Sequence, residues 1–196
     1  MTEIDVEIKN IIHRSIAVKE AVLNDNEMIE RITRFKSMVV NTYRNGGKVL
    51  FCGNGGSAAD AQHIAAELSG RFYIDRKPLA AEALHCNSSY MTSVSNDYGF
   101  EYAFARAVEA TGHKDDILVG ISTSGNSANI IKSFNKAREM GIFTIGMTGE
   151  SGGKLAALSD LIINVPSNDT PRIQEAHIMI GHIVCELVEK ELFGNG

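Results

Sequence analysis

The chain has 196 residues, of which 44% are hydrophobic and 22% are charged, and its formal net charge is −5. The length fits a single domain over residues 1–196 with its own core, and the acidic balance argues against nucleic-acid and anionic-membrane partners. No apolar run reaches the roughly 20 residues of a membrane span, and the N-terminus lacks a signal-peptide pattern. Because its three cysteines also lack Cys-x-x-Cys spacing, we expect a cytoplasmic protein.

The N-terminal segment has the periodicity of amphipathic helices. Apolar residues recur at helical spacing over residues 4–22 and again over residues 29–43. Asn24-Asp25-Asn26 interrupts this pattern, and Asn45-Gly46-Gly47 ends it with a favourable C-terminal cap. Residues 1–45 are therefore expected to form a helical arm, either a hairpin or one broken helix. Its apolar stripes suit a helical bundle between subunits.

From residue 48 onward, short apolar runs alternate with helix-length segments. Five strands are predicted, at Val49–Cys52, Leu79–Leu84, Ile117–Ile121, Phe143–Met147 and Leu161–Val165. Five helices are predicted, at Ala58–Ser69, Phe100–Ala110, Ala128–Met140, Lys154–Leu158 and Arg172–Leu192. Strands that are apolar on both faces predict a parallel sheet covered on both sides. Residues 48–196 are therefore expected to be a three-layer α/β core.

Two loops that follow predicted strands have similar chemistry. Gly53-Asn54-Gly55-Gly56-Ser57 follows the first strand, and Ser122-Thr123-Ser124-Gly125-Asn126-Ser127 follows the third. Each loop leads into a predicted helix, whose free N–H groups and dipole favour an anion. Glycine lets a ligand approach the backbone, and hydroxyls suit phosphate or sugar oxygens. The pair predicts a small, anionic, polyhydroxylated ligand.

Three nucleotide or hydrolase motifs fit these glycines poorly. The stretch Gly53-x-Gly55-x-x-Ala58 satisfies the loose dinucleotide fingerprint, but no acidic residue is cleanly placed after the second strand. The segment from Thr148 to Leu155 resembles a phosphate-binding P-loop, yet it lacks the leading glycine and the Ser or Thr after Lys154. The hydrolase pattern Gly-x-Ser-x-Gly is absent from the sequence.

Helical spacing brings several polar residues together. His63 and Glu67 are four residues apart, so they share one helix face close behind the first loop. Their apolar neighbours indicate a largely buried helix. The last predicted helix carries Gln174 and His182, and His177 is an equally possible partner there.

Four stretches carry a family resemblance: CGNGGSAADAQHIAAEL, SNDYGF, GISTSGNSANII and VPSNDTPRIQEAHIMIGHI. They resemble the phosphoheptose isomerases, enzymes of the sugar-isomerase (SIS) fold, and the similarity covers essentially the whole chain. The resemblance implies a three-layer, flavodoxin-like SIS domain with a five-stranded parallel sheet. It also implies conversion of sedoheptulose 7-phosphate to D-glycero-D-manno-heptose 7-phosphate. That reaction begins precursor synthesis for the heptose of bacterial lipopolysaccharide or other surface glycans.

The resemblance also assigns roles to individual residues. Substrate contacts are expected from Asn54, Gly55, Gly56, Ser57, Glu67, Asn96, Asp97, Ser122, Thr123, Ser124, Ser127 and Gln174. The family's zinc ligands, for one ion per subunit, match His63, Glu67, Gln174 and His182. Its catalytic residues match Glu67 and His182, and its assembly is a homotetramer.

The residue types suit aldose–ketose isomerisation, which moves a proton between C1 and C2 through an enediolate. The reaction needs a carbon base, an acid–base group for the oxygens and a cation near the developing oxyanion. A carboxylate bound tightly to zinc is a poor base, so Glu67 is expected to act mainly as the base, with a loose metal contact. His182 is expected to move the O1/O5 proton. Gln174 and His182 lie eight residues apart, about 12 Å along a helix, which is near the limit for one shared ion.

One alternative belongs to a different functional class. Some SIS proteins are non-catalytic, such as a replication-initiator-associating protein and sugar-phosphate-sensing regulators. Such a protein would keep the anion-binding loops without needing Glu67 and His182. The presence of both residues favours the isomerase.

Overall fold

The computed structural model describes residues 2–194, in which helices alternate with five strands. The strands are β1 (Val49–Gly53), β2 (Ala81–Ala83), β3 (Ile117–Ile121), β4 (Phe143–Thr148) and β5 (Leu161–Asn164). The α-helices are α1 (Glu3–Asn24), α2 (Asn26–Arg44), α3 (Gly56–Ser69), α4 (Ser88–Tyr98), α5 (Ala103–Thr111), α6 (Ala128–Glu139) and α7 (Thr170–Phe193). Two 3₁₀ helices, η1 (Phe100–Tyr102) and η2 (Gly153–Leu158), complete the described elements.

The strands form one parallel sheet in the order β2-β1-β3-β4-β5. Both β1 and β3 are buried along their whole length, and Val49 is paired with Ile117 at the start of their shared register. The parallel sheet and its flavodoxin-like order confirm the predicted fold class. In this order the chain reverses its direction of winding between β1 and β3, and ligands of such sheets bind at that switch point.

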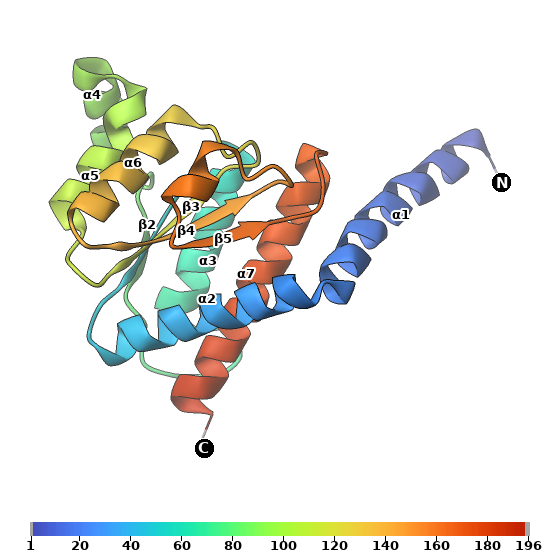
Figure 1. The fold of residues 1–196 in the computed structure, drawn as a ribbon, viewed down its shortest axis with the longest axis horizontal. Helices are drawn as coiled ribbons and strands as arrows, with labels where there is room; N and C mark the ends of the chain where they lie inside the picture. The colour runs from blue at the N-terminus through green and yellow to red at the C-terminus, as the bar shows by residue number, and fades with distance from the viewer. Residues whose placement is uncertain (1, 195–196) are drawn as a thin grey trace.

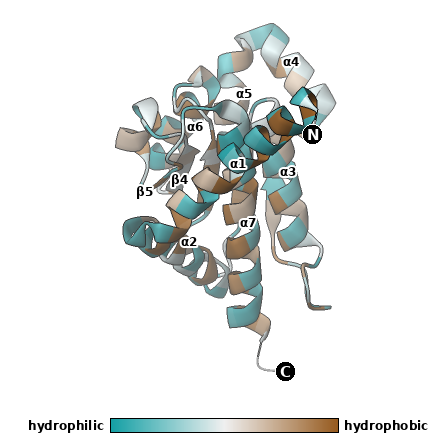
Figure 2. Cartoon of the chain, turned by 90° about the vertical axis from the view of Figure 1, so that its right-hand side faces the viewer, coloured by the Kyte–Doolittle hydropathy of each residue, from teal (hydrophilic) through white to brown (hydrophobic). Residues whose placement is uncertain are grey.

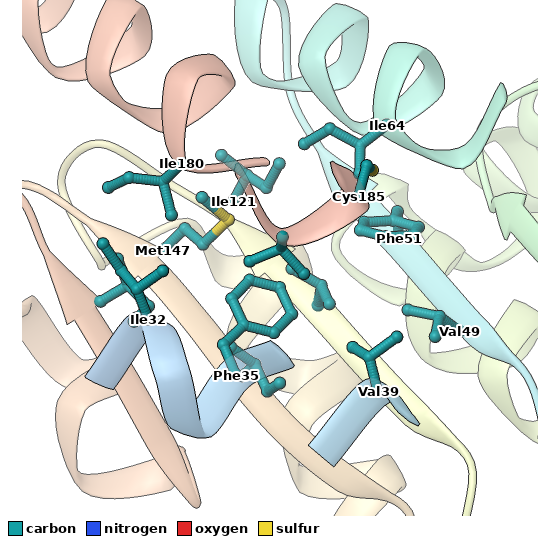
Figure 3. Packing of buried hydrophobic residues seen from close by; sticks show 14 of the residues in the cluster. Ile32, Phe35, Val39, Val49, Phe51, Ile64, Ile121, Met147, Ile180 and Cys185 are labelled. Atoms are coloured by element: carbon teal, nitrogen blue, oxygen red, sulfur yellow. The ribbon is translucent and has the colours of Figure 1, made fainter. Parts of the chain in front are cut away.

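Alternate strand residues face two separate cores. Phe51 and Val119 point to the side covered by α2, α3 and α7, whereas Leu50 and Leu118 point to the side of α5 and α6 (Figure 1). Figure 3 shows the first core, where Phe35 of α2 packs beneath the sheet residues. The three-layer arrangement follows because strands with apolar side chains on both faces must be covered twice.

The arm is one broken helix. Asp25 interrupts it, and its carboxylate accepts the N–H of Met28 at 3.1 Å to cap α2. Helix α2 lies along the sheet, but α1 extends away from the body of the protein, with hydrophobic segments on its surface (Figures 1 and 2). Of its residues only Val22 is buried, while Ile4 is 58% and Ile12 is 52% exposed.

Some predicted elements differ from the structure. Helix α4 was not predicted, because its sequence is rich in Ser, Thr and Asn and its apolar stripe is short, with Val94 buried and Tyr90 and Met91 partly buried beside it. The predicted strand at Leu79–Leu84 shrinks to the three residues of β2 at the sheet edge, and the predicted helix at Lys154–Leu158 is the 3₁₀ helix η2. Within residues 2–194, no helix has both the length and the apolar character needed to cross a membrane.

Candidate active site

The two predicted loops meet at the switch point of the sheet. Because β1 and β3 are neighbours, the loop after β1 lies beside the start of α6, which follows the β3 loop. The Asn54 amide donates to Asn129 Oδ1 at 3.0 Å, and the Asn129 amide donates back to Asn54 Oδ1 at 2.9 Å. Asn129 is buried in the first turn of α6. This amide pair fixes the first loop against the helix that follows the second.

The β3 loop gathers hydroxyl groups at the N-terminus of α6. The Ser122 and Ser127 hydroxyls lie 2.9 Å apart, and Ser124 Oγ accepts the backbone N–H of Asn126 at 3.2 Å. The N-cap residue Ser127 makes no side-chain hydrogen bond to the first turn of α6, in which the Ile130 N–H donates to Asn129 Oδ1 at 3.0 Å. Hydroxyls and free N–H groups at a helix N-terminus form an arrangement suited to phosphate.

The segment that resembled a P-loop supports this loop from behind. The Gly149 N–H donates to the Thr123 carbonyl at 2.9 Å, and the Leu155 N–H donates to the Gly125 carbonyl at 3.0 Å. Gly125 has φ of +64°, and a Cβ placed there would lie 2.1 Å from the Gly152 carbonyl oxygen. The sequence argues against a nucleotide site here, but the supporting contact depends on the fold and needs glycine at both Gly125 and Gly153.

The β1 loop presents backbone rather than side chains. Gly55 has φ of +53° and is the N-cap of α3, with no side-chain cap on the helix. A Cβ on Gly56 would lie 2.6 Å from Nε2 of Gln174, so the start of α7 packs directly on the start of α3. Ser57 is buried, and its N–H donates to the Asn54 carbonyl at 3.0 Å.

One cluster of titratable side chains joins α3 and α7. His63 Nε2 lies 3.1 Å from Glu67 Oε1 and 3.1 Å from His182 Nε2. The His63 side chain is 49% exposed and that of Glu67 is 26% exposed. The expected burial of this helix is therefore wrong for the face that carries the two residues, although the neighbouring face with Ile64 and Leu68 is buried.

The cluster has the chemistry of a zinc site. Its three ligand atoms all lie within 4.8 Å of one another, and two imidazole nitrogens with one carboxylate oxygen are donors that zinc accepts. Two atoms bound to one tetrahedral zinc lie about 3.3 Å apart, close to the separations here. His63 Nε2 carries at most one hydrogen, so it cannot donate to both partners, whereas a shared cation would satisfy all three atoms.

Gln174 lies nearer to the N-terminal ends of α3 and α7 than the His63–His182 contact does. It contacts Gly56, and Gly56 is seven residues before His63, which is about 10 Å along the helix axis. Gln174 thus sits beside the β1 loop, while His182 sits beside His63.

The structure distinguishes the two candidate histidines of α7. His177 is buried in the core, where its Nε2 donates to the Thr148 carbonyl at 3.0 Å. Burial lowers its pKa to about 4, although the carbonyl partly offsets this effect. His177 is therefore a neutral core residue, and His182 is the histidine that joins His63.

Asn96 and Asp97 lie on α4, the helix that the sequence analysis missed. The Asn96 amide donates to Asp97 Oδ1 at 2.8 Å, and both residues are exposed. Their expected substrate contacts remain a proposal, since no described contact links them to either loop.

Two further residues beside the cluster were not predicted. Asp60 lies three residues before His63, and burial raises its pKa to about 6, partly offset by His63. Its Oδ2 is buried and has no hydrogen-bond partner among residues 2–194. Phe72 packs against His182, with ring centroids 5.8 Å apart. The i, i+3 spacing of Asp60 and His63 was visible in the sequence, but the contact of Phe72 depends on the fold.

Comparison with known proteins agrees with this geometry. The SIS domain family matches residues 8–149. A phosphoheptose isomerase of Clostridium acetobutylicum is 55% identical over 191 residues, covering 97% of this chain and 95% of that protein. One of Aneurinibacillus thermoaerophilus is 52% identical over 188 residues, covering 96% and 95%.

A solved structure extends the similarity to three dimensions. The phosphoheptose isomerase of Neisseria gonorrhoeae superposes with a TM-score of 0.90 at 40% identity, covering 95% of this chain and 99% of that one. The match therefore includes the arm, the sheet and α7. The chain belongs to the SIS-domain family and, within it, to the phosphoheptose isomerases.

Proposed function

We propose that this protein interconverts sedoheptulose 7-phosphate and D-glycero-D-manno-heptose 7-phosphate in the cytoplasm. The product would supply the heptose of lipopolysaccharide or another surface glycan. The similarity to isomerases over nearly the full length argues against the non-catalytic alternative. The observation that carries the proposal is that His63 lies 3.1 Å from both Glu67 and His182. These residues stand on α3, which begins at the β1 loop, and on α7, which packs on that loop at Gly56.

The loops supply substrate binding in this proposal. Ser122, Thr123, Ser124 and Ser127 would hold the phosphate at the N-terminus of α6, where the helix dipole favours an anion. The chain of the sugar would lie along the β1 loop, against Asn54, Gly55, Gly56 and Ser57. Gln174 beside Gly56 fits a substrate contact, and Asn96 and Asp97 would complete the set from α4.

Proton transfer would be divided between two side chains. Glu67 would remove and return the proton that moves between C1 and C2, because its carboxylate is partly exposed beside His63. His182 would move the O1/O5 proton. Its ring is oriented by His63 on one side and by Phe72 on the other.

One zinc ion per subunit is the proposed cofactor, held by His63, Glu67 and His182. When bound, it would supply positive charge for the oxyanion that develops in the reaction. Gln174 contacts Gly56, about 10 Å along the helix from His63, so we propose it mainly as a substrate contact.

We also propose assembly into a homotetramer, with residues 1–45 as the arm that joins subunits of this SIS domain. Helix α1 carries exposed Ile4, Ile8 and Ile12 and is tied to α7 by the Ser15–Glu175 hydrogen bond of 2.6 Å. A second copy of the chain would cover this apolar surface. Light scattering at micromolar protein should give four times the chain mass, and a monomer would contradict the arrangement.

The function is tested by turnover of sedoheptulose 7-phosphate by the purified protein. We expect conversion by the protein as purified, loss after chelation and recovery on adding zinc. Fructose 6-phosphate serves as a control substrate that lacks the seventh carbon. Absence of turnover by zinc-loaded protein would refute the isomerase proposal, and full activity after complete metal removal would refute the zinc proposal alone.

A further inference from the structure

A buried ion pair holds the loop that follows α3. Arg76 Nε donates to Glu189 Oε2 at 2.7 Å, and both side chains are only 2% exposed. The Glu189 carboxylate also accepts the backbone N–H groups of Phe72, Tyr73 and Ile74, at 3.1, 2.7 and 2.9 Å. A buried carboxylate is stable only when its oxygens are satisfied in this way.

The guanidinium of Arg76 also caps the C-terminus of α3. Its Nη2 donates to the Glu67 carbonyl at 2.9 Å and its Nη1 to the Leu68 carbonyl at 2.9 Å. The last carbonyls of a helix have no partner within it, and a cation there also complements the helix dipole. Arg76 therefore fixes the turn that carries Glu67.

Glu189 stands on the helix that carries His182. The two residues are seven positions apart on α7, which is about two turns and hence the same face. The carboxylate holds the backbone of Phe72, whose ring packs on His182 at 5.8 Å. The ion pair is therefore bonded on one side to the helix end that carries Glu67, and on the other side to the backbone of Phe72, which packs on His182.

We propose that the Arg76–Glu189 pair is a positioning device that sets the placement of Glu67 relative to His182. Neither residue lines the cavity of about 610 Å³ beside His63, so both act through their neighbours. The geometry of an active group must hold to about 0.5 Å, and a misplacement of about 1 Å can cost 10²-fold in rate. The kinetic part of this inference rests on the proposed isomerase function.

The matched control is a second ion pair with a buried carboxylate, at the start of β3. Asp116 precedes β3, is 2% exposed, and accepts from Lys48 Nζ at 2.7 Å and from the N–H groups of Lys48 and His113 at 2.9 and 2.8 Å. Asp116→Asn removes the charge of a carboxylate that resembles Glu189 in burial and hydrogen bonding. It should lower the melting temperature without altering the catalytic group.

The test compares Glu189→Gln and Arg76→Lys with Asp116→Asn. The first two should lower kcat at least 10-fold while KM stays within threefold, and should weaken Zn²⁺ binding at least 10-fold by titration. Arg76→Lys keeps the charge but loses the forked contact with the Glu67 and Leu68 carbonyls, so it provides an independent variant if Glu189→Gln fails to fold.

A readout without turnover keeps the two proposals separate. In metal-free protein, the ring nitrogen NMR signals of His63 and His182 should shift in Glu189→Gln and Arg76→Lys but not in Asp116→Asn. If wild-type protein does not turn over the sugar, the proposed function fails while NMR and zinc titration still judge the positioning role. Wild-type signals and zinc affinity in both positioning variants, or equal losses in Asp116→Asn, would overturn the inference.

Discussion

Asn54 and Asn129 exchange two amide hydrogen bonds, of 3.0 and 2.9 Å, and thereby couple the β1 loop to α6. Asn129→Ala would leave the Asn54 amide without its partner and loosen the loop that faces the sugar. We expect KM for the sugar phosphate to rise about 10-fold, which corresponds to about 1.4 kcal/mol, with kcat changed much less. Steady-state kinetics test this, with Asn24→Ala as the control because that amide is far from both loops, on α1, where it donates to the Glu20 carbonyl. Unchanged KM would show that the amide pair has no part in binding.

The hydroxyl of Ser124 is the exposed member of the proposed phosphate loop. Ser124→Ala should weaken substrate binding by about 1–3 kcal/mol, because one phosphate oxygen would lose its donor. Calorimetric titration with the sugar phosphate measures the effect directly. Ser93→Ala is the control, since its hydroxyl donates to the Tyr90 carbonyl within α4. Equal affinity of both variants and wild type would place the phosphate elsewhere.

Glu67 is expected to be the carbon base. Glu67→Gln keeps the size of the side chain but removes the proton acceptor, so turnover should fall at least the ~10²-fold typical of a lost general base. Exchange of the substrate C1 or C2 proton with deuterated solvent should slow in parallel, while sugar phosphate still binds. Glu139→Gln, on the exposed end of α6, controls for loss of charge. Near-normal exchange in Glu67→Gln would assign the base to another residue, with His182 examined first.

Variants of Gln174 and His63 can separate substrate binding from zinc binding. Because it contacts Gly56 about 10 Å along the helix from His63, Gln174→Leu should raise KM at least fivefold and leave zinc affinity within threefold. His63→Leu should instead weaken zinc binding and change KM much less, since His63 Nε2 contacts both Glu67 and His182. A 100-fold loss of zinc affinity in Gln174→Leu would instead make it a ligand in the assembled enzyme.

The buried side chain of His177 should make the free energy of unfolding depend on pH. Its pKa in the folded protein, about 4, lies below the 6.5 of an exposed histidine, so between these values the unfolded chain binds the extra proton. The free energy of unfolding should therefore fall as pH decreases from about 6.5 to about 4, by about 3 kcal/mol from this residue. Urea titrations at several pH values should show the loss in wild type, and a shallower slope in His177→Gln. Equal slopes would exclude His177 as the source.

Most of the elements and the local chemistry could be predicted from the sequence. Apolar runs such as Val49–Cys52 specify buried strands, the glycines around Asn54 require open backbone, and a four-residue spacing places His63 and Glu67 on one helix face whatever the fold. These features depend on neighbours within a few positions. The break of the arm was predicted at Asn24-Asp25-Asn26, and the structure places the N-cap of α2 within it at Asp25, because a helix N-cap is also a local signal.

Only the tertiary structure decided which distant residues meet. Strand order places Asn54 beside Asn129, and the parallel packing of α3 on α7 selects His182 over His177. The contact of Gly149 with the Thr123 carbonyl and the burial of the Arg76–Glu189 pair likewise join segments far apart in sequence. Periodicity carries no information on such pairs, because which helix faces touch depends on how all the layers pack together.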